Sequence, residues 1–309
     1  MTIDSCLAGK DVYVEKPLAH NLRECQLMVE VASKTDRVVQ MGVQRRSQEL
    51  YAEACAFVRS GAIGKVAMAR CWIAGPRPSI GHVVDSDRPA GVDWNLFLGP
   101  APLRPFNRNR FHYRWRWFWD TGTGEIGNNG VHILDIGRWG LGAESPTRVV
   151  SAGGQLVHDD DRETPDTQLA TFEFPGGKVL TWEHRIWSAQ SLHGLRYGVE
   201  FLGERGSVLV SDGKWQVFEP DGKVVEHKGV SGWQQHVENF IECVGTRGRP
   251  NADVETAYRS TSLCLLANIT HRLGETVRWD GQAGVLEHPA GASRYLGRDY
   301  RSGFELPEV

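Results

Sequence analysis

The sequence predicts an α/β protein in which a partial parallel sheet is followed by an α/β domain with an open, largely antiparallel sheet. Two observations lead to this fold class. The beginning of the chain alternates short apolar runs with a helical pattern, which is the arrangement of a βαβ unit. Residues 147–227, in contrast, contain strand-like segments separated by glycine turns, with no helical pattern between them.

The βαβ unit is built around a short strand and the proline that follows it. Residues 12–14 form a β-branched and aromatic run, which predicts a buried parallel strand. Pro17 cannot continue such a strand, so Lys16 is expected at its carboxyl end, where ligands of open α/β sheets bind. A helix over residues 22–34 and a strand over 38–42 complete the unit.

The remaining elements are predicted from periodicity and turn chemistry. Helices are expected at residues 2–8, 48–60, 131–141, 234–244 and 254–273. Strands are expected at residues 65–73, 147–156, 168–174, 178–185, 197–202, 206–211, 214–219 and 223–227. The last two helices are expected to be amphipathic and to lie back on the first part of the chain.

Composition excludes several classes of partner. The net charge of −3 and the lack of a basic run argue against nucleic acid. No apolar run reaches the roughly eighteen residues of a membrane span, and the sequence starts without a signal-peptide pattern. The six cysteines are scattered without metal-ligand spacing, so we expect no metal site and a reducing, cytoplasmic location.

Residues 92–119 are unusually rich in aromatic and arginine side chains. Their alternation is typical of a strand or an extended lid. Such a segment could stack on single-stranded nucleic acid, but the acidic chain makes the wall of a polyol pocket the better hypothesis. The candidate substrate contacts here are His112, Tyr113 and Trp119.

A glycine-rich loop follows and leads into the helix at residues 131–141. The spacing places Asn128, His132 and Asp135 on one side of its first turns. Histidine suits proton transfer near neutral pH, as the oxidation of a hydroxyl requires. The alternative is that Asn128 or Asn129 caps the helix and His132 is a hydrogen-bonded core residue.

Three motifs, in order, give the chain a family resemblance. They are Glu15-Lys16-Pro17, the helix start Gly130-Val131-His132, and the ending from Phe240 through Pro250-Asn251-Ala252-Asp253 to Trp279-Asp280. The chain resembles the glucose-fructose oxidoreductase, inositol dehydrogenase and MocA (Gfo/Idh/MocA) family. The resemblance implies a Rossmann-type domain, an open-sheet domain, NAD or NADP as cofactor, and a sugar, cyclitol or related polyol as substrate.

The resemblance also implies domains and residue roles. It divides the chain into a remnant of the dinucleotide-binding domain (1–48), a substrate and dimerisation domain (49–270), and a segment packing back on the first domain (271–309). Lys16 and His132 would be catalytic, with the neutral Asn128 as the orienting group. We expect cofactor contacts from Glu15, Lys16, Pro17, Gln44 and Arg45, and substrate contacts from His112, Tyr113, Trp119, Asn129 and Asp135. The sequence leaves open whether the bond before Pro17 is cis.

Two departures from the family pattern keep a second hypothesis open. Asn128 stands where relatives often have aspartate, and the Gly-x-Gly-x-x-Gly turn is absent, so the cofactor site is incomplete in this chain. The first hypothesis is an N-terminally shortened oxidoreductase. The second is a non-catalytic remnant that acts as a saccharide-binding or dimerisation module. In either case the antiparallel sheet is expected to join subunits in a homo-oligomer.

Overall fold

The computed structural model describes residues 1–230 and 232–309. Its α-helices are α1 (Thr2–Leu7), α2 (Leu22–Thr35), α3 (Glu49–Arg59), α4 (Trp94–Leu98), α5 (Val131–Leu141), α6 (Gln234–Thr246) and α7 (Val254–Leu273). Its strands are β1 (Val12–Val14), β2 (Val39–Met41), β3 (Val66–Ala74), β4 (Arg148–Gly154), β5 (Thr167–Phe174), β6 (Lys178–Arg185), β7 (Tyr197–Gly203), β8 (Gly206–Ser211), β9 (Lys214–Phe218), β10 (Val224–Lys228), β11 (Val277–Asp280) and β12 (Val285–His288). Apart from α4, β11 and β12, each element overlaps a segment predicted from the sequence.

The small sheet holds β1 and β2 in parallel, with Val12 opposite Val39. α6 docks beside β2, because Nε2 of the buried His236 hydrogen-bonds to the Met41 carbonyl oxygen at 2.8 Å. β2 is buried, as predicted for this unit, but β1 is only half-buried. The prediction of a buried β1 was wrong: β1 contacts β2 and α1, whereas β2 is also covered by α7 and α6.

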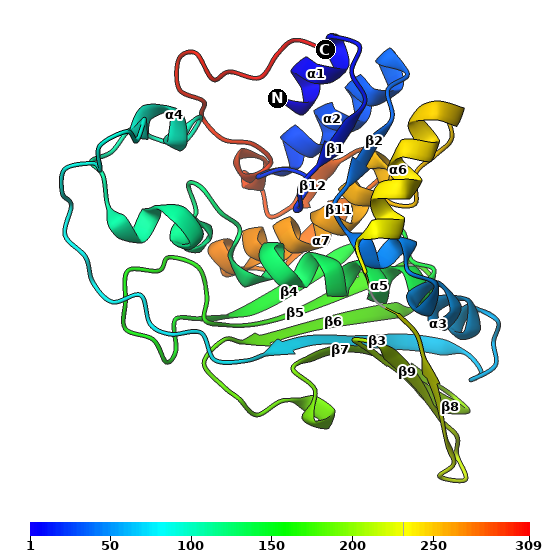
Figure 1. Cartoon of the computed structure of the whole chain (residues 1–309). Helices are drawn as coiled ribbons and strands as arrows, with labels where there is room; N and C mark the ends of the chain where they lie inside the picture. Colours follow the sequence, from blue (N-terminus) through cyan, green and yellow to red (C-terminus); the bar gives the residue numbers. More distant parts are fainter. Residues whose placement is uncertain (231) are drawn as a thin grey trace.

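The large sheet has ten strands in the order β10-β9-β8-β7-β3-β6-β5-β4-β11-β12. All neighbouring pairs are antiparallel except β3 and β6, which run parallel. The helices α3, α5 and α7 lie between this sheet and the small one (Figure 1). The largely antiparallel sheet expected from the sequence is therefore confirmed, with one parallel pair added.

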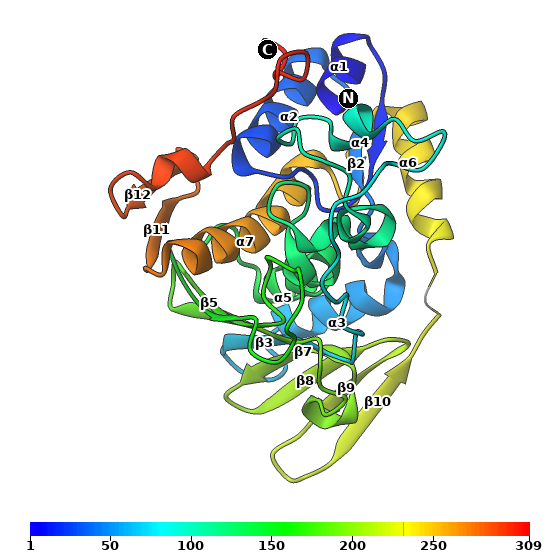
Figure 2. The same ribbon diagram turned by 90° about the vertical axis from the view of Figure 1, so that its left-hand side faces the viewer.

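The C-terminal segment does two things. Its strands β11 and β12 extend the large sheet beyond β4. The residues after them run back along α2, where the Arg23 amide donates to the Leu296 carbonyl oxygen at 2.7 Å and Asn21 donates to the Tyr300 hydroxyl at 3.1 Å. Figure 2 shows this last segment crossing from the large sheet towards the small one.

Helix α7 differs from the amphipathic helix that was predicted. Ser260 and each residue from there to Thr270 are buried, whichever side of the helix they occupy. The reason is its position between layers: α7 contacts β4 of the large sheet on one side and α2 and β2 on the other (Figure 1). A helix buried all round has no polar face. None of the helices in the described ranges is long and apolar enough to cross a bilayer.

Residues 92–119 form no strand, which corrects the sequence interpretation. The segment contains α4, a 3-10 helix at Arg108–Arg110 and another at His112–Trp117. Its aromatic rings pack on one another instead of alternating across a sheet: Trp94 stacks on Phe97 at 5.1 Å and meets Phe106 edge to face at 5.0 Å. This small cluster is a separate core that holds the segment beside the main one.

Candidate functional site

Lys16 lies where the sequence places it, just beyond the carboxyl end of β1. Its ammonium donates to both oxygens of Asn128, at 2.5 Å to the backbone carbonyl and 3.0 Å to the side-chain Oδ1. Burial and the nearby Arg116 lower the pKa of Lys16. The Lys16–Pro17 peptide bond is cis. These contacts join the small sheet to the glycine-rich loop.

The glycine-rich loop ends in one π-helical turn, Ile126–Gly130, which runs directly into α5. Neither Asn128 nor Asn129 caps α5, so the capping alternative is wrong. The glycines allow close approach to neighbouring elements. A Cβ on Gly127 would lie 1.8 Å from the hydroxyl of Thr123, and one on Gly130 would lie 3.0 Å from the ring of Trp182. The wide turn presents Asn128 to Lys16 and the Asn129 amide to Glu125.

His132 lies in the first turn of α5 and lines a cavity of about 330 Å³. Its Nδ1 is buried and has no hydrogen-bond partner among the described residues. Burial, Arg45 and Lys16 together lower the pKa of His132 to about 3. The imidazole is therefore neutral near pH 7 and able to accept a proton. Its free Nδ1 does not match the hydrogen-bonded core histidine of the alternative reading.

Asp135 does not reach the cavity, although the helical spacing suggested a substrate contact. Its side chain is 1% exposed and forms a two-point ion pair with Arg46, at 2.8 and 2.9 Å. The Ser260 hydroxyl donates to the same carboxylate at 2.5 Å. Arg46 holds the pKa of Asp135 below its usual value. Asp135 therefore supports α5, because its carboxylate is held by Arg46 and by Ser260 of α7 instead of lining the cavity.

The other predicted substrate residues separate into two groups. Tyr113 and Asn129 line the same cavity as His132. His112 is exposed outside it, and Trp119 lines a different cavity. Asn128 contacts Lys16 and not His132, so it does not orient the imidazole as the resemblance implied.

Glu125 is a site residue that the sequence interpretation missed. It is 1% exposed and accepts from Arg77 at 2.9 Å and from the Asn129 amide at 2.5 Å. Arg77 also donates to the Tyr113 hydroxyl at 3.0 Å. A glutamate between the glycines of Gly124-Glu125-Ile126-Gly127 was the available signal, because a buried charge in such a loop needs a partner.

The cavity is rich in arginine. Four arginines line it: Arg45, Arg77, Arg116 and Arg196. Of these four arginines, only Arg77 has a carboxylate of a described residue within 4.0 Å, that of Glu125. Arg116 is 9% exposed, lies over the Tyr113 ring at 3.3 Å, and has a buried Nε without a partner. Arg45 stacks on the Tyr197 ring at 4.6 Å. The cavity therefore carries an excess of positive charge.

A nicotinamide dinucleotide fits this chain in part. Lys16 and Pro17 at the end of β1, and the 3-10 helix Gln44–Ser47 after β2, occupy the strand ends where such a cofactor binds. Arg45 of that helix lines the cavity, whereas Glu15 is exposed beside Gly42. The described residues contain no glycine-rich turn at a parallel strand to hold a pyrophosphate. Nor do they contain a cluster of histidine, cysteine and carboxylate groups placed to bind a metal ion.

The fold and the site together define a class of protein. A lysine at the end of a parallel strand is hydrogen-bonded to an asparagine whose cavity also holds a neutral histidine. An open mixed sheet lies behind that cavity. This is the layout of an α/β enzyme with a hydrogen-bond donor at a strand end and a proton acceptor at a helix start, the pair of groups that chemistry on a hydroxyl group requires.

Comparisons with known proteins identify the family within that class. Residues 1–43 match a model described as an oxidoreductase family with an NAD-binding Rossmann fold. Residues 103–209 match the GFO/IDH/MocA C-terminal domain. The chain belongs to the Gfo/Idh/MocA family of oxidoreductases, as the sequence motifs indicated. The match to an NAD-binding model also agrees with the expected NAD(P) cofactor.

Three relatives show how far the likeness extends. The scyllo-inositol 2-dehydrogenase (NAD(+)) of Bacillus subtilis is 24% identical over 295 residues, which are 91% of this chain and 74% of that protein. An inositol dehydrogenase homologue from Azotobacter vinelandii, solved with NADH and myo-inositol, has a TM-score of 0.68 at 17% identity, covering 90% of this chain and 74% of its own. The aldose-aldose oxidoreductase of Caulobacter crescentus, complexed with glycerol, has a TM-score of 0.65 at 19% identity, covering 90% and 75%. These likenesses confirm the fold.

Proposed function

We propose that the chain catalyses NAD(P)-linked hydride transfer to or from a hydroxyl-bearing carbon of a sugar, cyclitol or related polyol that also carries an acidic group. The observation that carries this proposal is the convergence of Lys16, Asn128 and His132 beside an arginine-lined cavity. Relatives named for inositol and aldose substrates support the polyol part of the proposal. The acidic group is argued from this chain alone.

His132 and Lys16 divide the work at the reacting hydroxyl. In the oxidation direction the neutral His132 accepts the hydroxyl proton while the carbon loses hydride, so the alcohol becomes a carbonyl. Lys16 donates a hydrogen bond to the same oxygen and stabilises its developing negative charge. Asn128 holds the ammonium in place through its two oxygens. The nicotinamide, when bound, accepts the hydride.

The arginines argue for a negative charge on the substrate. Arg116 is nine-tenths buried, and its Nε lacks a partner among the described residues. A planar guanidinium in such a position binds a carboxylate with two hydrogen bonds. A bound anion would also raise the pKa of His132, which Arg45 and Lys16 now hold low, and would make it a better base.

The test compares paired substrates that differ by one charge. The chain is assayed with NAD⁺ and NADP⁺ at millimolar concentration, against D-glucose and D-glucuronate and against myo-inositol and its monocarboxylate analogue. We expect kcat/KM to be about 10-fold or more higher for the acid in at least one pair, the scale of one charge-assisted hydrogen bond. Arg116→Gln should remove that advantage, lowering kcat/KM for the acid about 10-fold more than for its neutral partner.

The control variant is Arg108→Gln, an exposed arginine of the same segment outside the cavity. It should leave both substrates unaffected. Equal kcat/KM for acid and neutral members would refute the acidic group, and no reduced cofactor with any polyol would refute the oxidoreductase. Polyol binding without turnover would instead favour the saccharide-binding module.

A further inference from the structure

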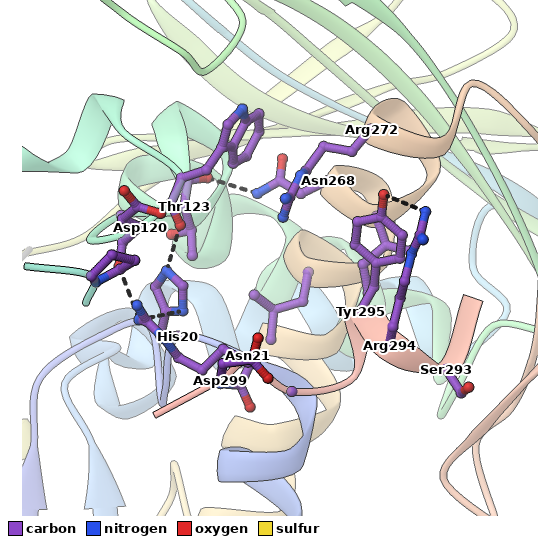
Figure 3. A pocket seen from close by; sticks show the side chains of 17 residues that line it. His20, Asn21, Asp120, Thr123, Asn268, Arg272, Ser293, Arg294, Tyr295 and Asp299 are labelled. Carbon is purple, nitrogen blue, oxygen red and sulfur yellow. Dashed lines mark hydrogen bonds between the residues drawn. The ribbon is translucent and has the colours of Figure 1, made fainter. Parts of the chain in front are cut away.

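A second cavity, of about 740 Å³, lies apart from the candidate site (Figure 3). Its walls come from five parts of the chain: residues 20–21 just before α2, Pro102, residues 119–123, the second half of α7, and the segment 293–299. It shares no lining residue with the cavity around His132. Its volume falls in the range of small-molecule sites, roughly 300–1,000 Å³. The roles described above make no use of it.

The cavity carries three arginines, Arg272, Arg294 and Arg298, and the first two lie over aromatic rings. Arg272 lies 5.2 Å from the Trp119 ring centre and 5.0 Å from that of Tyr295. Arg294 lies 5.1 Å from the same Tyr295 ring. Stacking orients a guanidinium without using its N–H donors. No carboxylate among the described residues lies within 4.0 Å of Arg272, Arg294 or Arg298.

Arg298 faces these two arginines from the side of His20. Its Nη1 donates to the Asp120 carbonyl oxygen at 2.9 Å and lies 3.5 Å from His20 Nδ1, while its buried Nε has no partner among the described residues. Figure 3 shows His20 and Asp120 on one side of the cavity and Arg272 with Tyr295 on the other. The three arginines therefore all line the cavity, from α7 and from the segment 293–299.

The carboxylates of the cavity do not cancel this charge. Asp120 is already paired with Arg104 and lies 3.8 Å from Arg110. Asp299 is exposed. Leaving the paired Asp120 aside, three guanidinium groups with no carboxylate of a described residue within 4.0 Å face one carboxylate, Asp299, so the cavity is cationic. Guanidinium forks match the oxygens of a phosphate in two-point hydrogen bonds.

We propose that this cavity binds a small organic phosphate, with the phosphate on Arg272, Arg294 and Arg298 and the organic ring against Trp119 and Tyr295. Inorganic phosphate would occupy only a small part of the space, and the aromatic faces offer nothing to it. A phosphate ester carrying a sugar or a nucleoside uses both features of the cavity. This site is independent of the function proposed for Lys16 and His132.

The experiment is calorimetric titration of the full chain with glucose 6-phosphate, adenosine 5′-monophosphate, inorganic phosphate and glucose. We expect one of the two esters to bind at least about 10-fold more tightly than inorganic phosphate, and glucose not to bind. Arg272→Gln and Arg294→Gln should each weaken the ester about 10-fold, the scale of a charge-assisted contact. Both arginines are exposed, so their replacement should leave the fold intact.

Arg278→Gln is the matched control, because Arg278 is an exposed arginine on β11 outside the cavity. It should bind the ester as the unmodified chain does. Which ester binds decides between a sugar and a nucleotide ligand. The proposal is overturned if neither ester binds at 10 mM, if inorganic phosphate binds as tightly, or if all three variants lose affinity equally. It is also overturned if saturating NAD⁺ displaces the ester, because the cavity would then belong to the cofactor.

Discussion

Replacing Asp135 by asparagine should destabilise the protein while leaving its chemistry nearly intact. Asp135 is 1% exposed and Arg46 is 10% exposed, so their ion pair is a buried one. Asp135→Asn keeps the shape of the side chain but removes its charge. Arg46, which also stacks over the Trp139 ring at 4.6 Å, would then be left as an uncompensated buried cation.

The expected loss in the free energy of unfolding follows from the burial of this ion pair. Breaking a buried pair by removing one partner costs about 3–5 kcal/mol, most of it from the charge left behind. Exposed pairs are worth about 0–1 kcal/mol. The matched control is Glu173→Gln, whose pair with Arg148 is 42% and 44% exposed. Urea unfolding should therefore separate the two variants by at least about 2 kcal/mol.

The kinetic readout distinguishes this account from the sequence interpretation of Asp135 as a substrate ligand. A residue that only supports α5 should leave KM within about 2-fold when activity is normalised to folded protein. An Asp135→Asn variant as stable as Glu173→Gln, with KM raised 10-fold or more, would refute the structural role.

Three further predictions follow from the same structure. Burial lowers the pKa of His20, His184 and His236, so the unfolded chain takes up protons first and the free energy of unfolding should fall as pH drops below about 6.5, by up to roughly 1.4 kcal/mol per histidine per pH unit; Tm should fall with it, and a constant Tm from pH 7 to 5 would contradict this. Leu169, 52% exposed on the large sheet, should lie in a subunit interface, and light scattering should find an oligomer that Leu169→Lys weakens. Asn128→Asp should raise the pKa of Lys16 by pairing with it and shift the basic limb of the pH-rate profile upwards, whereas an unchanged profile would argue against the contact.

The strands and turns were largely predictable because their signals are local. Asp212-Gly213 and Pro175-Gly176-Gly177 are turn sequences, and the hairpins lie where these residues place them. Lys16 was predictable for the same reason, because a charged pair and a proline directly after an apolar run fix a strand end. In each case the residues that determine the structure are neighbours in the chain.

The remaining features depend on contacts between distant segments. The π-helical turn at Ile126–Gly130 places Asn128 on Lys16, 112 positions earlier in the sequence. Arg77 and Arg196 come from loops around β3 and β7 and meet only in the folded cavity. The burial of α7 follows from the two sheets on either side of it, which helical periodicity does not reveal.

The most direct measurement of the central claim is turnover by Lys16→Ala and His132→Ala, with the best substrate of the paired panel. Because both side chains are proposed to act on the reacting oxygen, each substitution should lower kcat by roughly 100-fold or more. Lys65→Ala, an exposed lysine before β3, should turn over as the unmodified chain does. If the Lys16 and His132 variants retain full kcat, the site is not where the chemistry occurs.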